Sequence, residues 1–304
     1  MSIKNFEELK DYVSKLEPVR IAVAAADSEN VIHGVKLALD LNIIKEPILT
    51  GEKDKIKSLV NKYDLHIKEK DILQADNDKD AAVLAVKAVN DGKAEILAKG
   101  VLETVYYLKA IFDKENGIRK SKILNNLTLF EMDSYHKLIA ISDNAIIPDP
   151  TLEEKVEIVT NTLPLWKALK IENPKVAVLA AVEVVNSKMQ STIDASCLRT
   201  MSNRNQIKSF IIDGPLAYDV AINKKAAESK GLIGSEVAGD PDLLLMPNLE
   251  SANILGKSYK YHGNAKSGGM VFGAKVPVAL NSRSDSAERR LLAIIIARAV
   301  ASKI

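Results

Sequence analysis

The sequence is poor in cysteine and has no long apolar run. Its 304 residues include one cysteine, Cys197, which excludes an internal disulfide and accords with a reducing compartment. No Cys–His signature surrounds Cys197, so we expect a plain buried thiol rather than a nucleophile. No apolar stretch reaches the ~18 residues that a membrane-spanning helix needs, and the amphipathic N-terminus lacks the apolar centre of a signal peptide. We therefore expect a cytoplasmic protein that makes no membrane contact.

An excess of one charge and the usual metal-binding and nucleotide-binding spacings are also lacking. Lys and Arg number 42 against 40 for Asp and Glu, a net charge of +2. No global basic field therefore argues for nucleic acid as a partner. The four histidines have no HExxH or similar spacing, so we expect no metal site. The pair Gly268-Gly269 belongs to neither a GxGxxG motif nor a P-loop, and it implies no nucleotide-binding fold.

Short aliphatic runs alternate with helical periods along most of the chain, which predicts an α/β fold with mostly parallel sheets. The length favours two domains. A Pro- and Asp-rich segment, residues 143–155, marks the expected boundary, because the alternation restarts after it. The predicted strands are residues 20–26, 46–50, 94–99, 125–132, 137–142, 176–182, 210–214, 243–248 and 276–280, and a last helix is predicted over 291–300.

Polar residues that follow the predicted strands are the candidates for ligand binding, because ligands collect at the carboxyl ends of strands in open parallel sheets. After strand 276–280, Ser282-Arg283 precede the last helix. Free N–H groups at a helix start, a serine hydroxyl and a forked guanidinium together make an anion site. The alternative is that Ser284 or Ser286 caps the helix and the charges are solvated. For Ser282 with Arg283 we favour the ligand role.

Four segments stand out as a set: KVAVLAAVEVVNSKMQSTIDA (175–195), IDGPLAYDVAIN (212–223), AGDPDLLLMPNLESANILGKS (238–258) and SGGMVFGAKVPVALNSRSDS (267–286). Together they resemble the phosphate acetyl/butyryltransferase family, and the likeness is closer to its phosphate butyryltransferases. The PNLESANI stretch and the SRSDS turn are the most specific marks. The resemblance covers nearly the whole chain.

The resemblance implies a fold of the isocitrate-dehydrogenase-like, phosphotransacetylase type, with two α/β domains and the active site in the cleft between them. The last strand and helix return to the first domain in this family. The expected domains are therefore residues 1–145 with 272–304, and residues 146–271. The resemblance also implies a homodimer or higher homo-oligomer. It implies no metal and no tightly bound cofactor, coenzyme A being a substrate.

The activity that the resemblance implies is transfer of a short-chain acyl group between coenzyme A and inorganic phosphate, giving an acyl phosphate. Ser282 is then expected to bind the oxyanion and Arg283 the phosphate. In acetyl-transferring relatives an aspartate seven residues after the serine is the proposed base, but Arg289 stands there in this chain. Asp285 and Glu288 are the nearby carboxylates that could replace it.

The missing aspartate favours a longer acyl chain, butyryl, and a place in butanoate metabolism. Acetyl transfer or a branched acyl chain is the near alternative. A non-catalytic acyl-CoA-binding protein on the same fold is the alternative outside enzymes.

Seven further residues are expected to contact phosphate or coenzyme A. For the two basic ones a solvated surface position is an equal alternative, and for the two asparagines turn and cap bonds are. The aspartate matches an acidic turn of the family, and we favour a role in the cleft. These residues are Lys99, Arg119, Asp213, Asn248, Asn253, Ser267 and Gly268.

Overall fold

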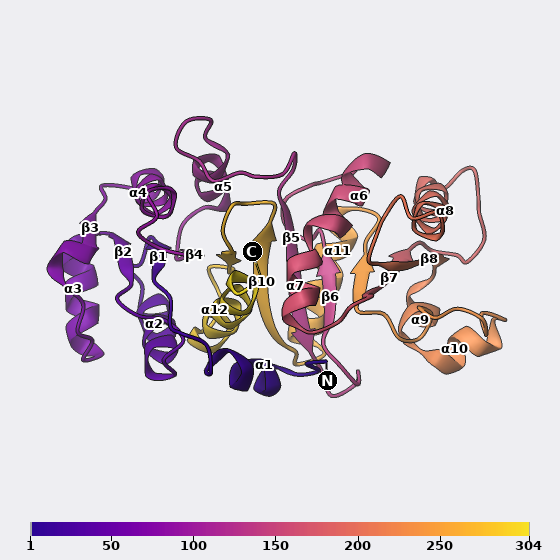
Figure 1. Cartoon of the computed structure of the whole chain (residues 1–304), viewed down its shortest axis with the longest axis horizontal. Coiled ribbons are helices and arrows are strands. Elements are labelled where there is room, and N and C mark those ends of the chain that lie inside the picture. The colour runs from indigo at the N-terminus through magenta and orange to yellow at the C-terminus, as the bar shows by residue number, and fades with distance from the viewer. Residues whose placement is uncertain (1, 304) are drawn as a thin grey trace. The chain divides into compact units, whose positions relative to one another are not determined.

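The computed structural model describes residues 2–303, and the chain divides into two compact units (Figure 1). The terminal unit comprises Phe6–Leu124 and residues 267–303, and the middle unit comprises Asn125–Lys266 with residues 2–5. The terminal unit is thus built from two separate stretches of chain.

The terminal unit alternates strands with helices. Its elements are α1 (Phe6–Val13), β1 (Ile21–Ala24), α2 (Glu29–Asp40), β2 (Ile48–Gly51), α3 (Lys53–Lys62), the 3-10 helix η1 (Glu69–Asp71), β3 (Ile72–Gln74), α4 (Asp78–Asn90), β4 (Ile96–Lys99), α5 (Thr104–Phe112), β10 (Lys266–Phe272), β11 (Val278–Leu280) and α12 (Ala287–Ala301).

The middle unit repeats the alternation with more helices. Its elements are β5 (Asn125–Glu131), β6 (Ile139–Ser142), α6 (Leu152–Asn161), α7 (Leu163–Ala168), β7 (Lys175–Leu179), α8 (Gln190–Asn203), β8 (Ile211–Leu216), α9 (Tyr218–Ile222), α10 (Lys224–Ser229), β9 (Leu243–Leu245) and α11 (Leu249–Tyr261).

The strands of the terminal unit lie in the order β3-β2-β1-β4-β11-β10. All neighbours from β3 to β11 are parallel, and β10 is antiparallel to β11. Strand β1 reads IAVA and is buried throughout, as is usual for parallel strands that are covered on both faces. In Figure 1, α4 and α5 lie on one side of these strands and α2 and α12 on the other. The predicted mostly parallel α/β sheet is therefore confirmed for this unit.

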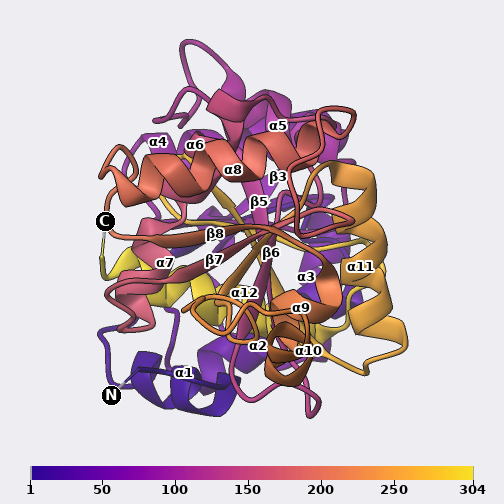
Figure 2. The ribbon, with the colours of Figure 1, turned by 90° about the vertical axis from the view of Figure 1, so that its right-hand side faces the viewer.

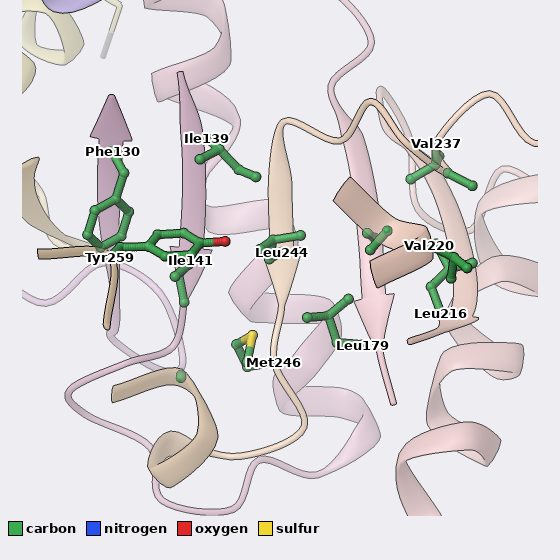
Figure 3. Close-up of a cluster of buried hydrophobic side chains, with 14 of the residues drawn as sticks. Phe130, Ile139, Ile141, Leu179, Leu216, Val220, Val237, Leu244, Met246 and Tyr259 are labelled. Carbon is green, nitrogen blue, oxygen red and sulfur yellow. The ribbon is translucent and has the colours of Figure 1, made fainter. Parts of the chain in front are cut away.

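The strands of the middle unit lie in the order β5-β6-β9-β7-β8. Strands β6, β9, β7 and β8 are parallel, and β5 is antiparallel to β6. Figure 2 shows α8 on one face of β7 and β8 and α9 on the other. Figure 3 shows part of the core on the α9 side, where Phe130, Ile141 and Leu244 pack with the ring of Tyr259.

The unit boundaries differ from the predicted ones. The sequence pattern predicts a boundary after residue 145 and a return at 272, whereas the structure has them at 125 and 267. Pairing explains both differences, because β5 binds β6 and β6 binds β9, while β10 binds β11. Residues 125–145 therefore belong with the middle unit.

Two strands lie where no strand was predicted, and most of the predicted strands are shorter in the structure. Strand β3 has three residues and lies at an edge, so it carries little hydrophobic pattern. Strand β10 reads KSGGMVF, and its two glycines resemble a loop. Strand β7 ends at Leu179, and residues 180–189 form a loop in which Val184 and Val185 are exposed. Within residues 2–303 no helix has the length and apolar character needed to cross a bilayer.

Helix α12 is largely buried in the terminal unit. All residues from Ala293 to Val300 are buried, and the helix packs on α2, β4 and β11. Strand β10 approaches it so closely at Gly268 that a Cβ there would lie 2.7 Å from Ile296 Cδ1 and 2.9 Å from the Ala293 nitrogen. The glycine is therefore required by packing between β10 and α12.

Gly100, at the end of β4, allows a similarly close approach to the end of β1. Its N–H donates to the Ala24 carbonyl at 2.7 Å, and a Cβ would lie 1.9 Å from the Ala25 oxygen. We expect Gly100→Ala to destabilise the fold by more than about 4 kcal/mol, because backbone atoms would have to move. Urea unfolding followed by circular dichroism measures this. Gly234→Ala, where no atom lies within 4 Å of the new methyl, is the control and should change stability by less than about 1 kcal/mol. An unchanged urea midpoint for Gly100→Ala would contradict the expectation.

Candidate active site

The turn between β11 and α12, residues 281–286, presents a serine–arginine pair to solvent. Strand β11 ends at Leu280, and α12 begins at Ala287. Ser282 and Arg283 are exposed, whereas Ser286 is the residue that caps α12, its hydroxyl accepting the N–H of the third helical residue. Capping therefore accounts for Ser286 and leaves Ser282 and Arg283 available to a ligand.

Asp285 holds this turn from the inside. Its side chain is buried, and its Oδ2 accepts the backbone N–H of Ser282 at 2.8 Å and the side-chain amide of Asn281 at 3.3 Å. A carboxylate that accepts a backbone N–H three residues before it stabilises a tight local loop. In the described structure Asp285 therefore fixes the backbone beneath the serine.

Arg290, in the first turns of α12, ties the serine turn to the end of β4. It is 3% exposed, and its two terminal nitrogens donate to the carbonyls of Lys99 (3.1 Å) and Ser282 (3.2 Å). Its Nε is buried without a hydrogen-bond partner in the described part of the chain. One guanidinium thus links the ends of two neighbouring parallel strands. Arg290 carries no signal of burial in the sequence, because a basic residue in the first turns of a helix is usually solvated.

Lys99 is the last residue of β4, which pairs with β11, so Lys99 and Ser282 belong to the same edge of the sheet. The side chain is buried, and Nζ donates to the Leu102 carbonyl at 2.6 Å. Burial lowers the pKa of Lys99 to about 8, and the positive charges of Arg290 and Arg283 act in the same direction. Lys99 therefore holds its proton weakly for a lysine.

The remaining carboxylates near the turn are exposed. Hydrogen bonding to Ser286 lowers the pKa of Glu288, with a smaller contribution in the same direction from His33. Glu103 lies 3.5 Å from the Arg283 guanidinium, and both side chains are more than half exposed. A carboxylate with a lowered pKa is a weak proton acceptor.

The other residues predicted in the terminal unit have three different environments. Arg119 is exposed and lies over the ring of Phe112 at 5.7 Å. Ser267 is 1% exposed, and its hydroxyl has no hydrogen-bond partner among residues 2–303. Gly268 lies beneath α12 and has the packing role given above. A ligand contact for these three stays a prediction.

Asp213, in β8, joins that strand to the loop before β9. Its carboxylate accepts the N–H of Gly214 at 2.8 Å and the hydroxyl of Ser235, and it lies 3.2 Å from Arg199 Nε. These three partners satisfy the carboxylate within the middle unit. Its predicted role toward a ligand stays a prediction.

The two asparagines make the turn and cap bonds that were the alternative to ligand binding. Asn248 caps α11 by accepting the N–H of Ser251 at 3.0 Å. Asn253 donates from its amide to the Asn144 carbonyl at 3.1 Å, which joins α11 to the loop after β6. Asn248 also lines a cavity of the middle unit.

The middle unit contains a cavity of about 910 Å³ at the carboxyl ends of β7 and β9. Its walls come from the loops after these strands and from the starts of α6, α8 and α11. Apolar side chains form most of the lining, among them Leu152, Leu179, Ile193, Met246 and Leu255. The position agrees with the rule that ligands collect at the carboxyl ends of parallel strands.

An ion pair buried in the wall of this cavity was not found from the sequence. Lys155 Nζ, on α6, lies 2.6 Å from Asp194 Oδ2, on α8, and each side chain is 5% exposed. The amide of Gln190 donates to the other oxygen of Asp194 at 2.8 Å. A charged residue on the apolar face of α8, between Ile193 and Ala195, was the available signal.

Neither Cys197 nor the side chains that commonly bind metals form a second candidate site among residues 2–303. Cys197 was expected to be buried, but it is half-buried and lines the cavity of the middle unit. Across residues 2–303 no group of three or more His, Cys, Asp and Glu side chains is placed to hold a metal ion.

We expect Lys155→Met to destabilise the protein by about 3–5 kcal/mol, because it leaves Asp194 as an unpaired buried charge. The double variant Lys155→Met/Asp194→Leu should recover most of that loss. Lys230, which pairs with Glu183 near the surface at 2.8 Å, supplies the control, and Lys230→Met should cost at most about 1 kcal/mol. Urea unfolding of the four proteins, wild type included, gives the comparison. Equal losses at Lys155 and Lys230 would show that burial of the pair is unimportant.

Comparison with known proteins gives a consistent family. The chain matches the family model described as "Phosphate acetyl/butaryl transferase" over residues 68–298. A phosphate butyryltransferase from Clostridium acetobutylicum is 41% identical over 299 residues, which cover 98% of this chain and 99% of that relative. A phosphate acetyltransferase from Thermotoga maritima is 37% identical over 275 residues, which cover 90% and 92%.

Solved structures agree. A branched-chain phosphotransacylase from Enterococcus faecalis superposes with a TM-score of 0.80 at 27% identity, covering 94% of this chain and all of the other. A phosphotransacetylase from Streptococcus pyogenes has a TM-score of 0.79 at 23% identity, with 98% of each chain covered, and supports the fold alone. The extent of these matches and the serine–arginine turn at the end of β11 lead to one conclusion: the chain belongs to the phosphate acetyl/butyryltransferase family.

Proposed function

We propose that this protein transfers a butyryl group between coenzyme A and inorganic phosphate. Membership of the family and the 41% identity to a phosphate butyryltransferase over nearly the whole chain support acyl transfer. The preference for butyryl over acetyl rests on the level of identity to butyryltransferases and on Arg289 at the position of the family's aspartate. No change of oxidation state occurs in this reaction, so we propose that no tightly bound cofactor takes part.

The observation that carries the proposal is the exposed pair Ser282-Arg283 at the carboxyl end of β11, supported from inside by Asp285 and Arg290. When a thiolate attacks the carbonyl carbon of an acyl phosphate, negative charge develops on the carbonyl oxygen and on the leaving phosphate. We assign the Ser282 hydroxyl to the first and the Arg283 guanidinium to the second. Donors that are fixed before the reaction need no reorganisation when charge develops.

The remaining predicted site residues take weaker parts in the proposal. Asp285 positions the serine turn, and Glu288 lies on the exposed side of α12. Lys99 lies at the end of β4, at the same edge of the sheet as Ser282. We further propose a cytoplasmic homodimer, in which the dimer rests on the family resemblance alone.

The butyryl proposal predicts a chain-length profile. Purified protein is incubated with phosphate and acetyl-, propionyl-, butyryl- or valeryl-CoA, and phosphate-dependent release of free thiol is measured with a thiol reagent. We expect the highest kcat/KM for butyryl-CoA, because each methylene changes the fit to an acyl pocket by about 1–3 kcal/mol. A maximum at acetyl-CoA would overturn the butyryl assignment only. Binding of acyl-CoA without turnover of any of the four would leave a binding protein on this fold.

The Ser282 assignment predicts a loss of transition-state stabilisation. We expect Ser282→Ala to lower kcat about 10²- to 10³-fold with butyryl-CoA, as removal of one oxyanion donor does in other acyl-transfer sites. Ser229→Ala, which removes an exposed hydroxyl of α10, is the control and should leave kcat unchanged. A Ser282→Ala variant with the wild-type kcat would remove the hydroxyl from the mechanism.

The positioning role of Asp285 predicts a difference between two substitutions. Asp285→Asn keeps an oxygen that accepts the Ser282 N–H, so we expect it to retain a substantial part of kcat. Asp285→Ala removes the acceptor and should cost about 1–3 kcal/mol of stability along with most activity. Steady-state kinetics and urea unfolding separate the two. If Asp285 were the base, Asp285→Asn would lose about 10²- to 10⁴-fold in kcat while remaining folded.

A further inference from the structure

We propose that Lys99 accepts the thiol proton of coenzyme A and that Arg290 is the residue that positions Lys99 for that step. The inference rests on the proposed acyl transfer. It starts from the arginine that replaces the family's aspartate at position 289. Three features of the terminal unit carry it: the engaged carboxylates, the buried pair of cations, and the link between Lys99 and Ser282.

The carboxylates around the serine turn already have other partners. Asp285 accepts the serine N–H at 2.8 Å. Glu103 faces Arg283 at 3.5 Å, and Asp78 accepts the N–H of Glu103 at 3.3 Å. Glu288 is exposed, and its pKa is lowered. The proton acceptor is therefore better sought among the basic groups.

Lys99 and Arg290 form a buried pair of like charges. Each is 3% exposed. Nζ of Lys99 and the terminal nitrogens of Arg290 donate to backbone carbonyls, and the carboxylate of Asp285 acts electrostatically on both cations. Two adjacent buried cations disfavour each other's charged form. Since a guanidinium keeps its proton, the amine is the group that loses one.

Four charged side chains act electrostatically on the Lys99 amine. Arg290, on α12, and Arg283, in the turn, favour the neutral amine together with burial, while Asp78, at the start of α4, and Asp285 favour the ammonium. The balance is a lysine pKa of about 8. The thiol of coenzyme A, like other free thiols, has a pKa near ~8.5, so proton transfer between the two groups is close to balanced.

The link through Arg290 fixes the backbone of Lys99 beside the backbone of the serine turn. The same guanidinium holds the carbonyls of Lys99 and Ser282, at 3.1 and 3.2 Å. The proposed step requires the four-carbon Lys99 side chain to rotate, so that Nζ leaves the Leu102 carbonyl for the bound thiol while the Lys99 backbone stays fixed. Arg290 itself touches no substrate and acts only through Lys99 and the serine turn.

The step balances as follows in the direction that consumes coenzyme A. Neutral Nζ of Lys99 takes the thiol proton and becomes an ammonium. The thiolate sulfur attacks the acyl carbon, the C–S bond forms, the C–O bond to phosphate breaks, and phosphate leaves with the electron pair. The ammonium then gives its proton to the departing phosphate. In the opposite direction phosphate attacks the thioester, and Lys99 returns the proton to the leaving thiolate.

The experiment compares Lys99→Arg with Lys99→Met. Arginine keeps the positive charge but cannot accept a proton at accessible pH, so it separates proton transfer from phosphate attraction. We expect both variants to lower kcat about 10²- to 10⁴-fold with butyryl phosphate and coenzyme A. We expect kcat of the wild type to rise near pH 8 and both variants to lose that rise. The profile is measured as kcat, because kcat/KM also reports the thiol of free coenzyme A.

The positioning role of Arg290 has its own signature. Removal of the guanidinium charge raises the pKa of Lys99, so in Arg290→Met the rise in kcat should move to higher pH and activity should recover at alkaline pH. Arg290→Lys keeps a positive charge and should return the rise toward its wild-type position. A purely structural role of Arg290 would lower kcat equally at all pH values and would overturn this part.

Three controls keep the outcomes distinct. Lys36→Met removes a partly exposed lysine that pairs with Asp40 on α2 and should behave as wild type. Urea unfolding of each variant identifies loss of fold, and Lys99→Arg then carries the test if Lys99→Met does not fold. Lys99→Arg with the wild-type kcat and pH profile would show that Lys99 acts by charge alone and would overturn the inference. Absence of turnover in the wild type would overturn the proposed function instead.

Discussion

The guanidinium of Arg290 is the contact on which the geometry of the serine turn depends. It binds the carbonyls at the ends of two neighbouring strands, and so fixes the turn after β11 against the end of β4. Its own position follows from the packing of α12, which β10 approaches closely because Gly268 has no side chain. A second arginine of the helix, Arg298, binds the carbonyl of Glu17 at 2.7 Å in the same manner. Helix α12 is therefore a largely buried helix whose two buried arginines, Arg290 and Arg298, donate hydrogen bonds to backbone carbonyls of other segments.

The buried and the solvent-exposed side chains of the turn have different roles. Asp285 and Ser286 form hydrogen bonds to backbone N–H groups and define the loop and the helix start. Ser282 and Arg283 point to solvent and are left for a ligand. Because Asp285 and Arg290 bind the backbone of Ser282 from beneath, the backbone that carries the exposed pair is fixed before any substrate binds.

The sequence sufficed for features that depend on local pattern. The apolar runs of β1, β4 and β11 predicted buried parallel strands, and the polar residues that follow β11 predicted an exposed turn, whose binding of an anion stays a prediction. Burial of Arg290 could not be predicted, because it depends on which face of α12 packs on α2 and β11. The pair Lys155–Asp194 joins two helices across 39 positions of the chain and appears only when those helices are packed together. The boundary at residue 125 likewise depends on strand pairing rather than composition.

The divided terminal unit has a consequence for how the protein is made. Strand β11 lies between β4 and β10, so the sheet begun by the first 99 residues is finished by residues 266–280. Chains leave the ribosome N-terminus first at roughly 5–20 residues per second, and domains fold as units. The middle unit is nearly continuous in sequence. It is therefore synthesised almost in full, and can fold, before the last strands of the terminal unit exist. During that interval β4 presents an open edge, and the turn that carries Ser282 and Arg283 is among the last parts of the chain to be synthesised.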